Sequence, residues 1–322
     1  MSTIRIGIIG CGRIAAAHLR GYMANSASVT AVADINQTAA EALAAAAGGA
    51  ECYRDPQALL ASGEVDAVSV CTPPTAHEAP VVEALERGIP VLCEKPFAAT
   101  IEAGRRMVAA AEHNGTFLMV AFPHRFRPAV QKMREIVQGN KLGDLVFFHN
   151  SFCGPVFWVK DTWYTRKSVA GGGVLLDICS HSVDLFRFLA GEVVEQHAVF
   201  HRHLHGIDVE DAGIIALKGK SGVIGTISAS WVVGAGQASI DLFGQRGRLS
   251  YMFGDEMTFS GHNGGRETIR VENSDGFIEE VGHFLAAIRG EVTLSCTGHD
   301  GLRTLEIILP LYRQAVPAHT ES

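Results

Sequence analysis

The first third of the chain alternates between two spacings of apolar residues. Short runs rich in Ile, Val and Ala are typical of buried strands, and they cover 4–9, 28–33, 65–71, 89–93 and 116–122. Between them, apolar residues recur at helical spacing over 13–23, 37–47, 56–62, 75–87 and 100–113. Strands that alternate with helices predict a doubly wound parallel sheet, in which ligands bind beyond the carboxyl ends of the strands.

Beyond Pro123 the pattern changes to runs of strands. Helices are expected over 128–138, over 277–289 and over 300–314, and a further helix follows 174–177 and ends at 189. Strands are expected over 145–152 and between 193 and 259. Strands without intervening helices predict an α+β domain with a largely antiparallel sheet and helices on one face. The other face needs a cover, and a second copy of the chain is the natural candidate.

Length and charge narrow the class of protein. A chain of 322 residues is long enough for two domains, here 1–123 and 124–322. The net charge is -7, from 27 basic and 34 acidic residues without a dense basic block, so we expect a small-molecule partner, no nucleic acid and no membrane. The first apolar run stops at Gly10, which predicts neither signal peptide nor membrane span and hence a cytoplasmic protein. Seven scattered cysteines without a C-x-x-C pair favour reduced thiols.

A glycine turn separates the first predicted strand from the first predicted helix. It reads Gly10-x-Gly12-x-x-Ala15. Gly10 makes the turn, Gly12 lets the backbone approach a pyrophosphate, and Ala15 lets the helix pack close to the strand. The positive end of the helix then faces the phosphates. With strands and helices alternating around it, this turn predicts a dinucleotide-binding Rossmann domain over 1–123.

Asp34 ends the second predicted strand. It follows Gly12 by 22 positions, close to the offset of roughly 20 at which a carboxylate hydrogen-bonds the ribose 2′-OH of NAD. The next residues, Ile35 and Asn36, supply no arginine for a 2′-phosphate, so NAD is favoured over NADP. The alternative is that Asp34 only caps the helix that follows.

Lys95 is the first candidate for chemistry. It follows the buried strand 89–93 inside the predicted cofactor crevice, and Pro96 stiffens the backbone that presents it. Its ammonium could donate to a substrate oxygen, with Glu94 as a ribose ligand or counter-ion. The alternative is an ordinary solvated lysine.

Asp177 and His181 are the second candidate, four residues apart after three consecutive glycines. If a helix has begun by Asp177, both project from one face and the carboxylate can orient the imidazole. Hydride transfer needs a base for the hydroxyl proton, and histidine suits that task. The alternatives are an N-cap role for Asp177 or Ser180 and a surface or core role for His181.

Two further groups attract attention. Three histidines alternate along one predicted strand at 201, 203 and 205, but no acidic or Cys cluster accompanies them at a zinc spacing, so no metal site is expected. Trp158, Trp163 and Tyr164 lie in an aromatic loop. They are either core residues or a stacking floor for a sugar ring.

Several motifs together resemble the Gfo/Idh/MocA oxidoreductases, the family of glucose-fructose oxidoreductase and inositol dehydrogenase. They run nearly end to end: Gly7 to Ala15, Cys71-Thr72-Pro73-Pro74 with His77, Glu94-Lys95-Pro96, His124-Arg125-Phe126 with Pro128, Gly171 to Asp177, His181 with Asp184, and Asp208-Val209-Glu210-Asp211. One departure is Cys179, which stands where the family often has Gly, so the turn before His181 is expected to differ in shape.

The resemblance implies a function. It implies hydride transfer between NAD(P) and a sugar, inositol or related polyol, and an open-faced sheet in 124–322 that binds substrate and forms a homodimer or homotetramer. Lys95 and His181 match residues that bind the reacting oxygen, one of them relaying its proton, and Asp177 matches the residue that positions them.

The expected cofactor-binding residues are Gly10, Gly12, Arg13, Ile14, Asp34, Ile35, Thr72, Pro73, His77, Glu94 and Lys95, and the substrate side is expected at His124, Trp163 and Arg166. Two alternatives stay open: a non-catalytic dinucleotide-binding sensor or scaffold of the same fold, and an enzyme that recycles a tightly held cofactor in place.

Overall fold

A computed structural model describes residues 3–274 and 276–314, which form two compact units. The first unit holds the described residues of Met1–Phe126 and Ser274–Arg303. The second holds those of Arg127–Asn273 and Thr304–Ser322.

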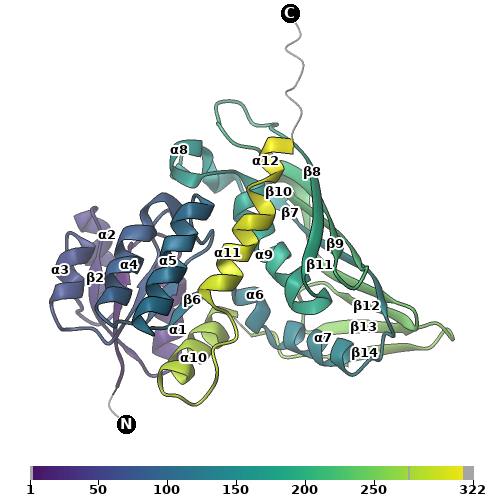
Figure 1. The fold of residues 1–322 in the computed structure, drawn as a ribbon, viewed down its shortest axis with the longest axis horizontal. Coiled ribbons are helices and arrows are strands. Elements are labelled where there is room, and N and C mark those ends of the chain that lie inside the picture. The colour runs from purple at the N-terminus through teal and green to yellow at the C-terminus, as the bar shows by residue number, and fades with distance from the viewer. Residues whose placement is uncertain (1–2, 275, 315–322) are drawn as a thin grey trace, which may run out of the picture. The chain divides into compact units, whose positions relative to one another are not determined.

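The first unit is built on a six-stranded parallel sheet of order β3-β2-β1-β4-β5-β6. Figure 1 labels two of its strands, β2 and β6. Its strands are β1 (Arg5–Ile9), β2 (Ser28–Ala33), β3 (Glu51–Tyr53), β4 (Ala67–Val70), β5 (Val91–Cys93) and β6 (Leu118–Val120). Its helices are α1 (Ala15–Ala24), α2 (Gln37–Ala46), α3 (Pro56–Ala61), η1 (Pro74–Ala76), α4 (Glu78–Glu86), α5 (Ile101–Asn114), α6 (Pro123–Phe126) and α10 (Gly276–Ile288). The predicted doubly wound sheet is confirmed, and its order reverses direction between β1 and β4, where such sheets bind nucleotides.

Local sequence signals explain most of these boundaries. The Thr100 hydroxyl caps α5 by accepting the Ala103 N–H at 3.1 Å, and Gly115 ends the helix with a φ of +59°. The Asp55 carboxylate caps α3 in the same way. The strand Glu51–Tyr53 was not predicted, because three residues are too few to show a period.

Residues 274–303 join the first unit, whereas the sequence pattern assigned them to the second domain. Helix α10 packs against α1, where a Cβ on Gly21 would lie 2.8 Å from the Val281 side chain. The Asn25 amide donates to the backbone oxygen of Ile278 at 2.9 Å. An amphipathic pattern says that a helix buries one face but does not say against which partner.

The second unit carries an eight-stranded sheet of order β14-β13-β12-β11-β7-β10-β9-β8. Its strands are β7 (Leu145–Pro155), β8 (Val193–His201), β9 (Ala212–Gly219), β10 (Ile224–Ser230), β11 (Val232–Gly244), β12 (Gly247–Tyr251), β13 (Glu256–Gly261) and β14 (Arg266–Arg270). All neighbouring pairs are antiparallel except β7 and β10, which confirms the largely antiparallel expectation. Strand β14 lies beyond the predicted run.

The helices of this unit are α7 (Pro128–Gln138), η2 (Phe157–Val159), η3 (Trp163–Thr165), α8 (Lys167–Ala170), α9 (Val174–Ala190) and α12 (Leu311–Gln314). Helix α11 (Gly298–Ile308) contributes residues to both units. The single helix expected over 300–314 is wrong, because Pro310 has no N–H to donate and separates α11 from α12.

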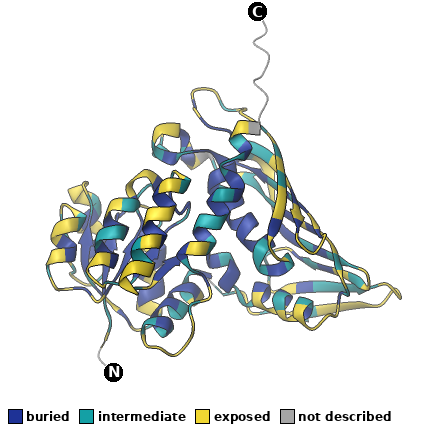
Figure 2. Cartoon of the chain, viewed as in Figure 1, coloured by how far each residue is buried: buried dark blue, intermediate teal, exposed yellow. Residues whose placement is uncertain are grey.

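Helix α9 is the core of the second unit and covers one face of the sheet. It contacts β7, β9 and β10, and it is dark blue along most of its length in Figure 2. The stretch Lys167–Ala190 is long and apolar enough to cross a membrane, but 83% of its most apolar window is buried, as expected of a core helix. On the opposite face of the sheet, Phe147, Val199, Ile214 and Ile224 are exposed.

Candidate active site

The glycine turn lies at the carboxyl end of β1 in the first unit. Gly10 has a φ of +91°, and a Cβ there would lie 2.7 Å from the backbone of Cys71 and Thr72. Only glycine fits so close to the end of β4. A Cβ on Gly12 would meet no atom within 4 Å from any described residue other than its two chain neighbours. The turn therefore leaves space beside Gly12, as a bound pyrophosphate requires.

The start of α1 suits an anion. In the described part of the chain, α1 has no side-chain cap at Ile14 and no acidic residue in its first turn, so the helix dipole there is not neutralised locally. Arg13 is exposed and Ile14 half-buried. These features fit the diphosphate of a dinucleotide.

Asp34 ties the end of β2 to the glycine turn. Its Oδ2 accepts the Cys11 N–H at 2.6 Å and its Oδ1 accepts the Asn36 N–H at 2.7 Å. The cap of α2 is Asn36, whose side chain accepts the Ala39 N–H, so the capping alternative for Asp34 is wrong. The neighbouring Ile35 is 96% exposed. A carboxylate with remaining lone pairs thus stands at the end of β2, where the sequence predicts the ligand of the ribose.

Glu94 and Lys95 follow β5 on the same edge of the sheet. The Glu94 side chain is buried, and its Oε2 accepts the backbone N–H of Lys95 at 2.9 Å. Lys95 itself is half-buried. Because the carboxyl ends of adjacent parallel strands share one edge, the sheet order places Lys95 two strands from the glycine turn.

His77 contacts the backbone of the segments that follow β4 and β5. It is fully buried, with Nδ1 3.1 Å from the Phe97 oxygen and Nε2 2.7 Å from the Thr72 oxygen. Burial lowers the pKa of His77. The His77 ring thus joins the backbone of Thr72 to the segment after Lys95, and Thr72 and Pro73 themselves are half-buried.

A buried polar chain in the same unit was not predicted. His18 and Tyr22 of α1 contact Ser69 of β4, and His18 also contacts Glu94. A signal was present, because helical spacing puts His18 on the apolar face of α1 with Ala15, Leu19 and Tyr22.

In the second unit, α9 presents Asp177 and His181. The cap position of α9 is Gly173, and the Asp177 N–H donates to the Gly173 oxygen at 2.8 Å, so the helix has begun by Asp177. The N-cap alternative for Asp177 and Ser180 is therefore wrong, and the two predicted residues share one helix face. Both side chains are nine-tenths buried.

The glycines before α9 are explained by a buried carboxylate. Glu210 accepts the N–H groups of Gly173 and Leu175 at 3.0 Å and the Tyr312 hydroxyl at 2.7 Å. A Cβ on Gly173 would lie 1.9 Å from the Glu210 backbone oxygen, and one on Gly172 2.2 Å from the Tyr312 hydroxyl. Burial raises the pKa of Glu210. Glu210 thus anchors the start of the helix that carries Asp177 and His181.

The predicted substrate-side residues lie in both units. His124 is half-buried in α6 of the first unit. Trp163 stacks on Tyr164 at 3.8 Å between ring centroids, and Tyr164 meets Trp158 edge-on at 5.1 Å, so the aromatic loop packs on itself. Arg166 is exposed at the start of α8.

The prediction that three histidines alternate along one strand is wrong, because β8 ends at His201 and the strand does not extend to His203 or His205. His201 and His203 pack edge-on at 4.8 Å, and within 3–274 and 276–314 no three His, Cys, Asp or Glu side chains are grouped to hold a metal. None of the seven cysteines, all of which lie in these ranges, forms a disulfide. Burial raises the pKa of Cys11 to about 12.

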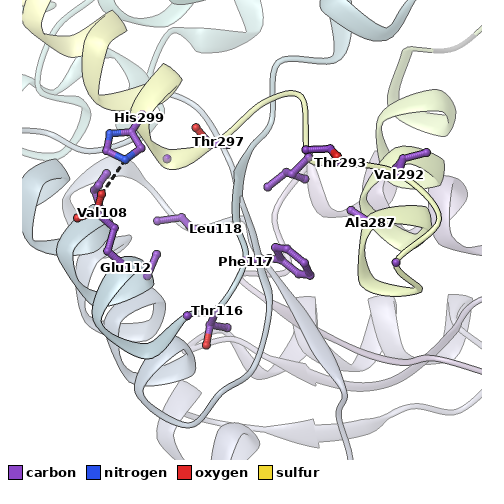
Figure 3. A pocket seen from close by; sticks show the side chains of 15 residues that line it. Val108, Glu112, Thr116, Phe117, Leu118, Ala287, Val292, Thr293, Thr297 and His299 are labelled. Atoms are coloured by element: carbon purple, nitrogen blue, oxygen red, sulfur yellow. Dashed lines mark hydrogen bonds and ion pairs between the residues drawn. The ribbon is translucent and has the colours of Figure 1, made fainter.

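A separate apolar hollow of about 550 Å³ lies beside α5 and β6 (Figure 3). Phe117, Leu118 and Val292 line it, and His299 contacts Glu112 at 2.9 Å on its rim. None of the predicted cofactor or catalytic residues lines this hollow.

The sheet order, the glycine turn and the carboxylate after β2 define the first unit as a dinucleotide-binding Rossmann domain. Comparison with known proteins gives the family. Residues 4–122 match the "Oxidoreductase family, NAD-binding Rossmann fold", and residues 130–250 match the "GFO/IDH/MocA C-terminal domain". The chain therefore belongs to the Gfo/Idh/MocA family of oxidoreductases and is an NAD-binding enzyme.

Individual relatives span different parts of the chain. It is 28% identical to myo-inositol 2-dehydrogenase of Thermotoga maritima over 94% of this chain and 93% of that protein. It is 37% identical to D-glucoside 3-dehydrogenase of Escherichia coli over 59% of this chain, a match that spans only 55% of that enzyme. Levoglucosan dehydrogenase, solved with NADH and levoglucosan, shares the fold with a TM-score of 0.90, at 22% identity over 97% of this chain and 98% of that one.

Proposed function

We propose that this enzyme transfers a hydride between NAD and a secondary alcohol or carbonyl of a sugar, inositol or related polyol. The names of its relatives as inositol and glucoside dehydrogenases support this substrate class. The observation that carries the proposal is Lys95, which stands on the same edge of the parallel sheet as the glycine turn and Asp34.

The positions of residues in the first unit suggest which part of the cofactor each one binds. The glycine turn and the uncapped start of α1 bind the diphosphate, and Asp34 accepts from the adenosine ribose, with Ile35 as an apolar surface beside it. The Asp34 carboxylate also repels a 2′-phosphate, so we expect tighter binding of NADH than of NADPH. Bound NAD supplies the hydride acceptor.

Protons and the reacting oxygen are handled by this chain's own side chains. The Lys95 ammonium donates to the substrate oxygen and stabilises negative charge on it. His181 takes the hydroxyl proton, and Asp177, one turn earlier on the same face of α9, orients its imidazole.

The test is a panel of inositols, aldoses and glucosides with NAD, followed by NADH absorbance. Lys95→Met and His181→Asn are expected to lower kcat by roughly 100- to 10,000-fold, as loss of a proton-transfer group does. The matched controls are Lys132→Met and His197→Asn, which change exposed residues paired with Glu135 and Glu195. Full turnover in both active-site variants refutes the roles, and NADH binding without turnover on any alcohol points to a sensor.

We further propose that a second copy of the chain covers the exposed face of the eight-stranded sheet, as a homodimer or homotetramer in the cytoplasm. Phe147 and Ile224 are paired neighbours on this face and are 40% and 45% exposed. Contiguous exposed apolar side chains of this kind are typical of an interface. Light scattering on the wild type and on Phe147→Lys tests it: an assembly that loses mass in the variant supports the proposal, and a monomeric wild type refutes it.

A further inference from the structure

Four buried side chains form a continuous hydrogen-bonded path in the first unit, between α1, β4 and the residue that follows β5. Tyr22, His18 and Ser69 are 0% exposed and Glu94 is 4% exposed. The Tyr22 and Ser69 hydroxyl oxygens are 2.7 Å apart, and Ser69 Oγ lies 3.0 Å from His18 Nδ1. His18 Nε2 lies 2.9 Å from Glu94 Oε1.

The carboxylate sets the direction of this path. A carboxylate only accepts, so His18 donates its Nε2–H to Glu94. In that tautomer Nδ1 accepts the Ser69 hydroxyl, and Ser69 in turn accepts the Tyr22 hydroxyl. Every hydrogen along the path then has an acceptor, as buried polar groups require.

The path ends on the backbone of Lys95. The second Glu94 oxygen, Oε2, accepts the Lys95 N–H at 2.9 Å. The carboxylate is thus held between the His18 ring and the Lys95 amide, and the plane of the carboxylate is fixed from both sides. Loss of the His18 bond would let Glu94 turn and would move the residue that follows it.

We propose that His18 is a positioning residue for Lys95, acting through Glu94. The proposal rests on the proposed function of Lys95. The alternative is that His18 only fills space between α1, β4 and the end of β5, in which case any side chain of similar size and polarity serves.

Two amide variants separate these roles. The Gln amide reaches the place of Nε2, so His18→Gln can still donate to Glu94. The shorter Asn amide reaches only the place of Nδ1, so His18→Asn keeps the Ser69 contact and loses the Glu94 contact. Tyr22→Phe is the control, because it removes one buried hydroxyl and leaves the bond from His18 to Glu94 in place.

The measurements are kcat and KM for the best alcohol of the panel, the dissociation constant of NADH by fluorescence, and the melting temperature. We expect His18→Asn to lower kcat by roughly 10- to 100-fold, more than it raises KM, because misplacement of a catalytic group by about 1 Å has that effect. His18→Gln is expected to restore most of kcat, and Tyr22→Phe to lower the melting temperature with kcat within about twofold of the wild type.

Equal kcat values in His18→Asn and His18→Gln would overturn the proposal, and so would a Tyr22→Phe variant as slow as His18→Asn. If the wild type turns over no alcohol, the proposed function fails. The affinity for NADH then tests by itself whether His18 positions Glu94. Binding several-fold weaker in His18→Asn than in His18→Gln supports the positioning of Glu94, and equal binding refutes it.

Discussion

Replacing Gly12 by alanine adds one methyl group at the place where the structure leaves space beside the glycine turn. Apart from Gly12 and its two chain neighbours, no described residue has an atom within 4 Å of that methyl position, and Gly12 does not need a positive φ. The free energy of unfolding should therefore change by no more than about 0.5 kcal/mol. The same methyl group would hold a pyrophosphate away from the backbone.

The cost to cofactor binding can be estimated. A hydrogen bond to a charged group contributes about 1.5–3 kcal/mol, so loss of one phosphate contact weakens NADH binding roughly 10- to 100-fold. Gly10→Ala is expected to lower the stability of the fold instead. Its φ of +91° and a Cβ 2.7 Å from the Cys71 and Thr72 backbone cost about 2–5 kcal/mol of folding free energy, from left-handed backbone strain and overpacking.

The assay compares thermal unfolding and NADH titration for both variants beside the wild type. We expect Gly12→Ala to melt with the wild type and to bind NADH poorly, and Gly10→Ala to melt several degrees lower. Wild-type NADH affinity in Gly12→Ala would refute the placement of the pyrophosphate, and an unchanged melting temperature in Gly10→Ala would refute the close contact with the end of β4.

Three further predictions follow from buried groups. Burial lowers the pKa of His77, so its contribution to stability is present above the ordinary value of 6.5 and is lost as pH falls through the lowered pKa; unfolding at stepped pH should show a shallower slope below 6.5 in His77→Gln. Gly173→Ala puts a Cβ 1.9 Å from the Glu210 oxygen and should lower stability by at least about 1–3 kcal/mol, whereas Gly234→Ala meets open space and should melt with the wild type. The Cys11 thiol, with its pKa near 12, should resist alkylation in the native protein at neutral pH and react once it is unfolded, as mass spectrometry of labelled peptides would show.

Local patterns predicted the parts of the fold that depend on near neighbours in the chain. Strand β2 and helix α7 occupy the predicted ranges, and Thr100 caps α5 as expected. Caps, glycine turns and apolar periods act over a few residues, so they can be read directly. The same reading missed β14, which carries little apolar alternation, and ran through Pro310 where the helix ends.

The candidate site shows the same division. Gly10, Asp34, Lys95, Asp177 and His181 could be selected because each follows a recognisable strand end or glycine run. The role of His18 could not, because a histidine on the buried face of a helix says nothing of its partner. Its contact with Glu94 joins residues 76 positions apart.

By itself, the sequence determined the class of fold, the glycine turn, NAD as the cofactor and the residue types available for proton transfer. Tertiary structure alone decided that Asp34 accepts from Cys11, that α10 packs against α1, and that Glu210 and Tyr312 hold the start of α9. The physical reason is that these contacts depend on which distant segments pack together, and a hydrogen bond needs its donor within about 3 Å of its acceptor.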